Sequence, residues 1–416
     1  MNSRDGTRRG PGWRAGLVLG LLVLTAFLVY LYRAELFILL VLGRSDMDWV
    51  QQVERENSTG HESAEGVVAT ADGFCVFGHT NSRRPGVDQA WVLRFGMAPP
   101  PRWERTYGAG ERVTGTLSRA MASLPGGGFI VVGEQESVGR LFLGWLLALS
   151  PEGEVLWERT LGLAEGSALQ AVAVLEDGSI VAGGSQSREG WVVRVDSRGE
   201  VLWDVQLPQL ERVTALVALP AQRVAVLGTA ETSSVALGVS RLFLLESDGR
   251  VTAEKRFPEG VQGELVSMAL LPEGGLIATG RQRQSAPDDD RLWVVRMDPR
   301  GELLWEYLPE GTSDEAGLAI TALPDGGAVV LGYNWKEMLV DREAKVWRFS
   351  ADGRLVWQQS YGGAKEDLGT GIARLADESL VVVGMTTSQG AGKTDLWTFG
   401  LSPEGQLLWE ETFGAK

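Results

Sequence analysis

A tryptophan that returns about every 50 residues is the feature that most restricts the fold of this chain. It ends closely similar lines of sequence, such as PEGEVLWERT at 151–160 and PEGQLLWEET at 403–412. Repeats of this length are units that bury an apolar face only against their neighbours. The repeated position is occupied by Trp49, Trp103, Trp157, Trp203, Ala253, Trp305, Trp357 and Trp409.

Each unit shows the same internal order, which residues 316–363 illustrate. An apolar stretch ends in a Gly-containing turn, a β-branched run closed by Gly follows, and a variable polar loop leads to two further short apolar runs. Apolar runs joined by Asp-Gly or Gly-Gly predict β-hairpins, and no segment has the length and period of a helix. Four short strands per unit predict an all-β chain folded as a seven-bladed β-propeller of four-stranded blades.

The predicted propeller spans residues 46–416. Trp49 lies in an eighth candidate outer strand, at 46–53, although only seven sets of the other three strands can be counted. Because a ring removes its exposed sheet edges by closing, we expect one terminus to supply the outer strand of the last blade, with strand 46–53 involved in the closure.

The N-terminus predicts a membrane segment. Residues 15–32 carry no charge, and the apolar sequence continues to residue 43. Arginines precede it, so the positive-inside rule predicts a cytoplasmic basic tail at 1–14, a transmembrane signal anchor at 15–43 and an exported propeller. A cleaved signal peptide is the alternative. The basic residues of the tail are Arg4, Arg8, Arg9 and Arg14.

Composition excludes several classes of site. The formal net charge of −15 disfavours nucleic-acid binding. Cys75 is the single cysteine, so no intramolecular disulfide or cysteine-built zinc site can form, and we expect it to be a buried strand residue. His61 and His79 are the only histidines, which disfavours a histidine metal centre and a Ser-His-Asp catalytic triad.

The lines RVDSRGEVLW (194–203), RMDPRGELLW (296–305) and LSPEGQLLW (401–409) resemble the Gly-x-x-x-Trp docking motif of PQQ-like bacterial propellers. The whole unit is similar to the repeats of exported bacterial propeller proteins of unknown role. The resemblance implies a propeller whose outer-strand Trp packs on the next blade. Quinoprotein dehydrogenases of this type also imply adjacent cysteines and a calcium site. Because no Cys-Cys pair is present, we expect no cofactor.

Other candidate motifs favour structural roles. The acidic runs PDDDR (287–291) and KED (365–367) lack the ligand spacing of a dedicated Ca²⁺ loop, so solvated turns are expected. The glycine-rich LPGGGFIVVG lacks the Lys-Ser/Thr of a phosphate-binding loop and predicts a hairpin turn. We therefore predict no catalytic, cofactor or metal residue from these motifs.

Binding residues are expected where the units differ, in the loops between the second and third strands of each blade. These loops occupy 79–89, 134–144, 230–240, 281–291 and 333–344. Trp335 lies outside the repeat register, and we predict that it is an aromatic anchor on a recognition face. The alternative is that Trp335 packs against its own blade. The predicted flanking residues are Lys336, Arg83, Arg84, Arg281 and Arg283.

The sequence favours a membrane-anchored, single-pass protein of the bacterial cell membrane. Its N-terminus would be cytoplasmic and its propeller periplasmic or extracellular. The propeller would be a non-catalytic platform for an envelope protein or small ligand, with no nucleic acid. A second possibility among binding proteins is a factor that resembles the propeller lipoproteins of outer-membrane assembly, although the lipid-bearing Cys is missing. The alternative is an envelope hydrolase or lyase with a site at the central channel mouth. An enzyme requires convergent ionisable groups with shifted pKa values, whereas a platform requires a broad aromatic and charged patch.

Overall fold

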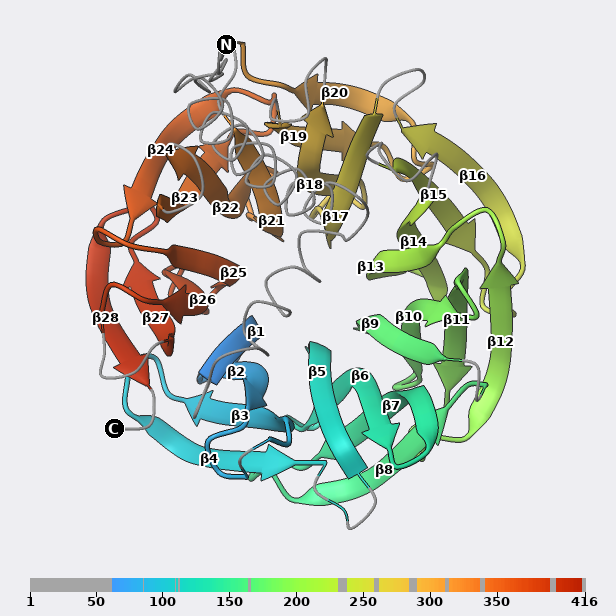
Figure 1. Cartoon of the computed structure of the whole chain (residues 1–416). Helices are drawn as coiled ribbons and strands as arrows, with labels where there is room; N and C mark the ends of the chain where they lie inside the picture. The colour runs from blue at the N-terminus through green and yellow to red at the C-terminus, as the bar shows by residue number, and fades with distance from the viewer. Residues whose placement is uncertain are drawn as a thin grey trace, which may run out of the picture. The chain divides into compact units, whose positions relative to one another are not determined.

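The fold was analysed in a computed structural model (Figure 1). It describes residues 62–84, 86–108, 110, 113–163, 166–230, 238–257, 262–283, 290–310, 314–336, 341–389 and 394–413. The predicted tail, anchor and strand 46–53 lie outside these residues. Within the described ranges, no helical segment is long and apolar enough to cross a bilayer.

The described residues form strands β1 to β28, which we group by fours, in chain order, into blades 1 to 7. The strands are β1 (Glu62–Thr70), β2 (Gly73–Thr80), β3 (Gln89–Phe95), β4 (Pro101–Tyr107), β5 (Val113–Ser123), β6 (Phe129–Ser137), β7 (Arg140–Leu149), β8 (Val155–Leu161), β9 (Ser167–Val174), β10 (Ile180–Gln186), β11 (Glu189–Val195), β12 (Val201–Leu207), β13 (Arg212–Leu219), β14 (Arg223–Ala230), β15 (Val239–Leu245), β16 (Val251–Phe257), β17 (Gln262–Leu270), β18 (Leu276–Arg283), β19 (Asp290–Met297), β20 (Leu303–Tyr307), β21 (Glu315–Ala322), β22 (Ala328–Lys336), β23 (Asp341–Phe349), β24 (Leu355–Tyr361), β25 (Asp367–Arg374), β26 (Leu380–Thr386), β27 (Asp395–Leu401) and β28 (Leu407–Phe413).

Each blade is an antiparallel meander of four consecutive strands. Five sheets have four strands, and one has eight because blades 4 and 5 are joined by a single parallel pair, Val239 with Gly263. The prediction of an all-β chain built from repeated four-stranded sheets is confirmed. Every blade is contiguous in sequence within the described residues, so no outer strand is exchanged between the two ends.

The innermost strands close the ring. Each first strand contacts the first strand of the next blade, and β25 of blade 7 contacts β1 of blade 1. The Thr370 hydroxyl donates a hydrogen bond to the Ala64 carbonyl across this last junction, at 2.7 Å. Figure 1 shows these strands innermost, with the fourth strands at the rim.

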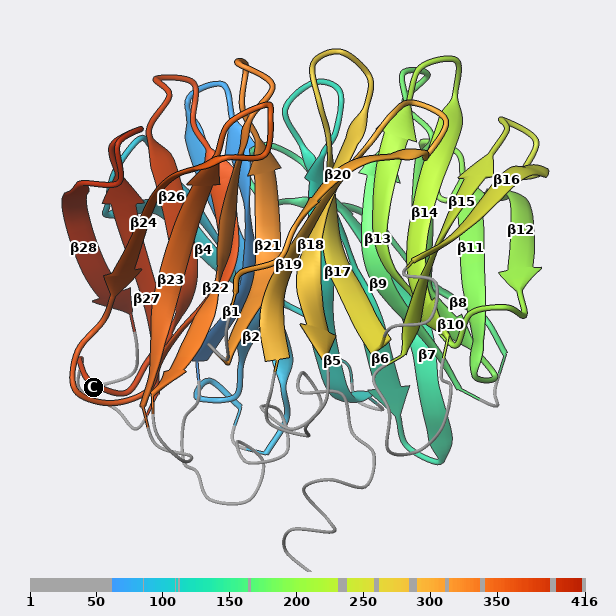
Figure 2. The same ribbon diagram turned by 90° about the horizontal axis from the view of Figure 1, so that it is seen from above.

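The two faces of the propeller follow from the antiparallel order. Turns between strands 1 and 2 and between strands 3 and 4 lie on one side, which we call the turn face (Figure 2). Strands 2 and 3 meet on the opposite side, where one blade also leads to the next, and we call this side the loop face. The middle strands are buried throughout in blade 7, whereas every residue of the outer β28 is exposed or half-buried.

A glycine near the end of each second strand faces a β-bulge in the first strand. In blade 6, Gly332 pairs with Gly317 and the register shifts before Ala319. A Cβ on Gly332 would lie 1.8 Å from the Ala316 carbonyl oxygen. No side chain fits there, which explains why each β-branched run ends in glycine. The equivalent residues are Gly78, Gly133, Gly184, Gly228, Gly280 and Gly384.

The repeated tryptophan joins consecutive blades, as predicted. Trp357 on β24 of blade 6 donates from Nε1 to the Pro403 carbonyl in blade 7, at 3.2 Å, and its ring lies against Gly405. The Gly of one motif therefore receives the Trp of the preceding blade. The same bond joins Trp103 to Pro151, Trp157 to Ser197, Trp203 to Ser247 and Trp305 to Ala351.

Two junctions depart from this pattern. At the ring closure, Trp409 stacks on Phe74 of blade 1, with ring centroids 6.0 Å apart. Between blades 4 and 5, Ala253 replaces the tryptophan, and Leu242 comes closest to the space beside Gly301. Aromatic stacking at the ring closure and an apolar contact beside Gly301 therefore take the place of the indole hydrogen bond at these two junctions.

A second tryptophan set lies on the third strands and is satisfied within its own blade. Trp91, Trp145, Trp293 and Trp397 donate to Glu104, Glu158, Glu306 and Glu410 at 2.9, 2.6, 3.1 and 2.7 Å. In blade 3 the acceptor position holds Asp204, which is one methylene shorter. The buried Nε1 of Trp191 has no hydrogen-bond partner in the described structure.

Asp204→Glu is expected to raise the free energy of unfolding by about 0.5–1.5 kcal/mol, because the longer side chain can accept the Trp191 hydrogen bond. Urea unfolding followed by tryptophan fluorescence measures the change. Asp204→Leu offers no acceptor and serves as the control. Equal stability of the Glu and Leu variants would contradict the assignment.

Candidate binding surface and channel cluster

Two of the predicted variable loops on the loop face, 134–144 and 333–344, are mostly strand. The interval 333–344 was expected to be a loop, but β22 runs to Lys336 and β23 begins at Asp341. Trp335 pairs with Arg342 and Lys336 with Asp341 along the hairpin. This loop prediction was wrong because the polar residues after the glycine of the second strand continue the strand. A polar composition alone does not mark the end of a strand.

A chain of ion pairs crosses the loop face from blade 4 into blade 5. Arg212 on β13 donates to Glu264 on β17 at 2.9 Å, and Arg281 on β18 lies 3.5 Å from the same carboxylate. Arg281 also donates to Asp290 on β19 at 2.9 Å, as does Arg283 at 2.8 Å. These side chains are largely buried, so the network fixes their charges in position.

Arg342 extends this charged region into blade 6. Its side chain is only 6% exposed, it lies over the Tyr333 ring at 5.4 Å, and its guanidinium is 3.7 Å from Glu366. Burial lowers the pKa of Arg342, the charges of Tyr333 and Glu366 oppose that shift, and the positive charge of Arg281 lowers the pKa further. The loop face of blades 5 and 6 therefore carries two largely buried guanidinium groups, those of Arg281 and Arg342.

The predicted binding residues fall into two groups. Arg281, Arg283 and the backbone of Trp335 and Lys336 belong to the adjacent blades 5 and 6. Arg83 and Arg84 follow β2 in blade 1, with blade 7 between. Arg83 pairs with Glu104, and Arg84 donates to the Gly110 carbonyl at 3.5 Å. The six residues do not form one patch.

Sequence reasoning missed Arg212, Glu264 and Arg342. None of them belongs to a motif. Arg212 and Glu264 meet because the first strands of consecutive blades start at the same face, and Arg342 lies near the start of the third strand of blade 6 on that face. The usable signal was positional. Aligning the repeats places Arg212 and Glu264 at the starts of first strands.

The acidic motifs have structural partners. Asp290, from PDDDR, joins the ion-pair network. Asp367, from KED, accepts hydrogen bonds from Thr386 and from Ser388, the latter at 2.7 Å. Across the described ranges, no three Asp, Glu, His or Cys side chains are grouped so that they could hold a metal ion.

A second polar cluster lies on the innermost strands of blades 1 and 2. The bulge residue of each first strand is half-buried, and in these two blades it is ionisable. Glu65 lies 3.4 Å from Nδ1 of His79, and Arg119 pairs with Glu134. His79 is a strand-end residue, as expected. The bulge residues of blades 3 to 7 are Gln170, Thr214, Val266, Leu318 and Thr370.

The carboxyl group of Glu65 titrates below its usual range. Burial would raise its pKa, but the hydrogen bond with His79 and the positive charge of Arg119 lower it by more. A group with a lowered folded-state pKa stabilises the fold above its unfolded-state pKa, and this stabilisation is lost as the pH falls through the folded value.

Glu65→Gln is therefore expected to lower the free energy of unfolding by about 1–3 kcal/mol at pH 7. The difference from wild type should begin to shrink below about pH 4.5, where Glu65 of the unfolded chain takes up a proton, and should be lost as the pH falls through the lower pKa of the folded state. Denaturant unfolding across this pH range measures it, with the exposed turn variant Glu404→Gln as the control. A difference independent of pH would contradict the account.

The strongest pKa perturbations belong to the core. Burial raises the pKa of Cys75, which is a free, buried strand residue as expected. Burial raises the pKa of Tyr361 to about 12, and its hydroxyl donates to the Gly405 carbonyl at the junction of blades 6 and 7. These shifts reflect packing. The candidate sites are therefore defined by charge geometry.

The family assignment agrees with this architecture. The family model described as outer membrane protein assembly factor BamB, a PQQ-type repeat model, matches residues 188–415, more than half of the chain. The chain belongs to this family. The match covers the repeats that carry the Gly-x-x-x-Trp lines and confirms the PQQ-like resemblance. Among curated proteins, none matches this BamB-type chain.

Solved structures similar to this BamB-type chain include two enzymes. Virginiamycin B lyase from Staphylococcus aureus, in a catalytically inactive form with quinupristin, is 12% identical, with a TM-score of 0.52 over 79% of this chain and 93% of the lyase. A point mutant of puromycin hydrolase, complexed with PGG, is 15% identical, with a TM-score of 0.54 over 86% of this chain and 54% of the hydrolase. The chain thus spans about half of the hydrolase. At these identities the likeness concerns the fold alone.

Proposed function

We propose that the chain is a membrane-anchored, exported, seven-bladed propeller whose loop face binds a protein partner of the cell envelope. Residues 15–43 would form the anchor, with the propeller outside the cytoplasm. Membership of a family described as an outer membrane assembly factor supports a protein partner over a small ligand.

The observation that carries the proposal is the charge network of blades 4 to 6. Buried ion pairs contribute little net stability, because desolvation offsets their attraction. Rigidly held charges instead suit selective recognition, since a partner must match their positions. Arg342 pairs with Trp335 along the β22–β23 hairpin, and Arg281 belongs to the adjacent blade 5, so a hydrophobic anchor and flanking charges would share this part of the loop face.

The test is co-isolation of the tagged full chain from membranes of cells that produce it. We expect Trp335→Ala and Arg281→Gln each to reduce the captured partner about tenfold or more. Arg354→Gln, an exposed change on the turn face, is the matched control and should leave capture unchanged. A partner retained equally by all three variants would overturn the proposed binding face.

The proposed orientation has its own test. In spheroplasts of the producing cells, added protease should degrade the propeller while a cytoplasmic marker stays intact, because the positive-inside rule places the tail inside. A propeller protected until the membrane is lysed would contradict export.

One observation favours the alternative, a hydrolase or lyase. Glu65 on the innermost strand β1 and His79 on the neighbouring β2 form a carboxylate–imidazole pair, an arrangement that can orient a general base. In that case His79→Gln would abolish turnover of the substrate while partner capture persisted. If the chain is a platform alone, the same variant leaves capture intact and no activity is there to lose.

A further inference from the structure

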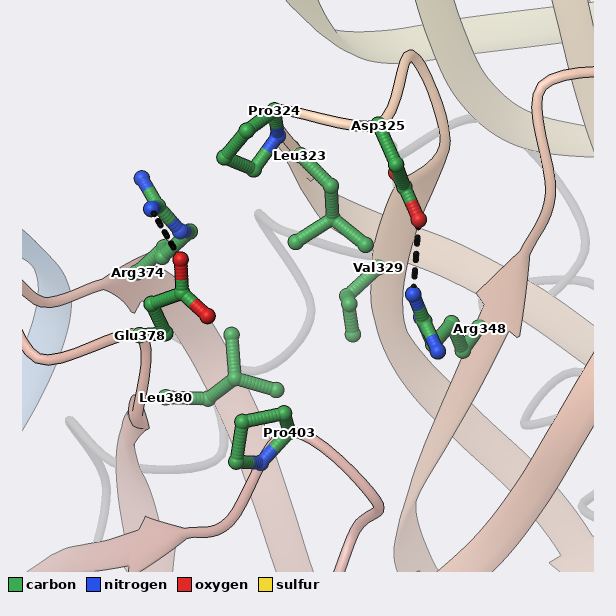
Figure 3. Close-up of a pocket in the computed structure, with 9 residues that line it drawn as sticks. All are labelled: Leu323, Pro324, Asp325, Val329, Arg348, Arg374, Glu378, Leu380 and Pro403. Atoms are coloured by element: carbon green, nitrogen blue, oxygen red, sulfur yellow. Dashed lines mark hydrogen bonds and ion pairs between the residues drawn. The ribbon is translucent and has the colours of Figure 1, made fainter.

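A pocket of about 150 Å³ opens between blades 6 and 7 on the turn face, opposite the proposed binding face. Figure 3 shows an apolar floor flanked by two charged pairs, Arg348 with Asp325 and Arg374 with Glu378. Two prolines complete the wall. The remaining lining residues are Leu323, Pro324, Val329, Leu380 and Pro403.

The repeat shows that Arg348 has donors to spare. Its equivalent in blade 3, Arg194, donates to the Ser247 carbonyl of the next blade at 2.6 Å. In blade 5, Arg296 does the same with Ala351 at 2.5 Å. Arg348 donates only to Asp325 among the described residues, and the matching acceptor, the Pro403 carbonyl, receives only Trp357. The pocket lies between Arg348 and Pro403 (Figure 3).

The opposite wall also departs from the repeat. Glu378 has a φ of 72°, at the turn position where blades 3, 5 and 6 have Gly178, Gly274 and Gly326. Its carboxylate lies 3.5 Å from Arg374. A non-Gly residue in this left-handed region is uncommon. Arg374 also lines a second hollow, of about 400 Å³, between blades 7, 1 and 2.

The two arginines of the pocket are less exposed than the acidic residues with which they pair. The Arg348 and Arg374 side chains are 27% and 28% exposed, whereas Asp325 and Glu378 are 52% and 67% exposed. Exposed ion pairs contribute little, so both carboxylates can turn toward water at small cost. The two guanidinium groups then line the pocket with N–H groups that can donate to another carboxylate.

We propose that this pocket binds a carboxylate attached to a small aliphatic residue. The carboxylate would accept hydrogen bonds from Arg348 and Arg374, and the aliphatic side chain would lie on Leu323, Val329 and Leu380. A peptide C-terminus and a free acyl amino acid share this chemistry. The inference concerns the turn face and stands apart from the proposed partner on the loop face.

N-acetyl-L-leucine is the probe, with N-acetyl-L-leucinamide as its uncharged match. Isothermal titration calorimetry of the detergent-solubilised full chain should give a millimolar dissociation constant for N-acetyl-L-leucine, as expected for so small a ligand. N-acetyl-L-leucinamide should bind at least tenfold more weakly. Leucine-terminated peptides with free and amidated ends then separate the two sources. Tighter binding of the free-ended peptide than of N-acetyl-L-leucine assigns the site to chain ends, and the reverse assigns it to acyl amino acids.

Arg348→Gln should weaken N-acetyl-L-leucine binding about tenfold or more, while the exposed Arg354→Gln leaves it unchanged. Glu378→Gly restores the glycine that the repeat has at this turn position, so the fold is kept. It also removes a carboxylate that competes for Arg374, so the affinity for N-acetyl-L-leucine should rise by about two- to threefold. Equal binding of acid and amide, or an unchanged affinity in Arg348→Gln, overturns the proposal. If Arg348→Gln does not fold, Glu378→Gly decides, and a constant or lower affinity there overturns it.

Discussion

Trp397→Ala is expected to lower the free energy of unfolding by about 3–5 kcal/mol, the cost of truncating a large buried aromatic residue. Trp397 is 1% exposed and packs against Phe399, with ring centroids 4.4 Å apart. It belongs to a core cluster that joins blades 6 and 7, together with Leu331 and Tyr361. Truncation also leaves Glu410 without its indole donor.

Urea unfolding measures this loss, and Leu408→Ala is the matched control in the same blade. Leu408 is 56% exposed on the outer strand, so its truncation should change the free energy of unfolding by no more than about 0.5 kcal/mol. A loss below about 1 kcal/mol for Trp397→Ala would show that the junction of blades 6 and 7 is held by other contacts.

Gly332→Ala is expected to lower the free energy of unfolding by about 3 kcal/mol, because the added methyl group cannot avoid the backbone of the neighbouring strand. The Cβ would lie 1.8 Å from the Ala316 carbonyl oxygen. Gly115, in β5, has open space where its Cβ would be, so Gly115→Ala is the control and should be close to neutral. Similar losses for both variants would mean that glycine flexibility, and not the close approach, sets the cost.

The repeat predicted the elements that every blade must contain. The Gly-x-x-x-Trp line could be assigned to blade docking because it recurs in most units and resembles the docking motif of PQQ-like propellers. Ring closure could not be predicted in this way. Its contacts, Phe74 with Trp409 and Thr370 with Ala64, each occur once, and only the closed ring brings them together.

The candidate sites were harder to predict because their residues do not repeat. Arg281 and Arg283 were identified from their place after a second strand, and the structure puts them in a charged network. Arg342 lies within the predicted loop 333–344 and Glu264 at the start of a first strand, but neither position predicts a charged partner, because the partners depend on which strand ends share a face. Physical reasoning from one sequence thus fixes the frame of the blades, while long-range packing decides which charges meet.

The two faces of the propeller carry different chemistry. The loop face of blades 4 to 6 presents charges held by buried ion pairs, and the turn face presents a small pocket whose arginines have exposed, exchangeable partners. Both features arise where a blade departs from its neighbours. A shared scaffold with local departures is how repeat folds acquire separate binding surfaces.

Site-specific photo-crosslinking in producing cells tests the central claim most directly. A photoreactive amino acid is placed at Lys336, at the loop end of β22, or at Arg198, an exposed residue in the turn between β11 and β12. The account predicts a discrete crosslinked protein from position 336 and none from position 198. The same adduct from position 198 with none from position 336 would contradict the loop face as the binding surface.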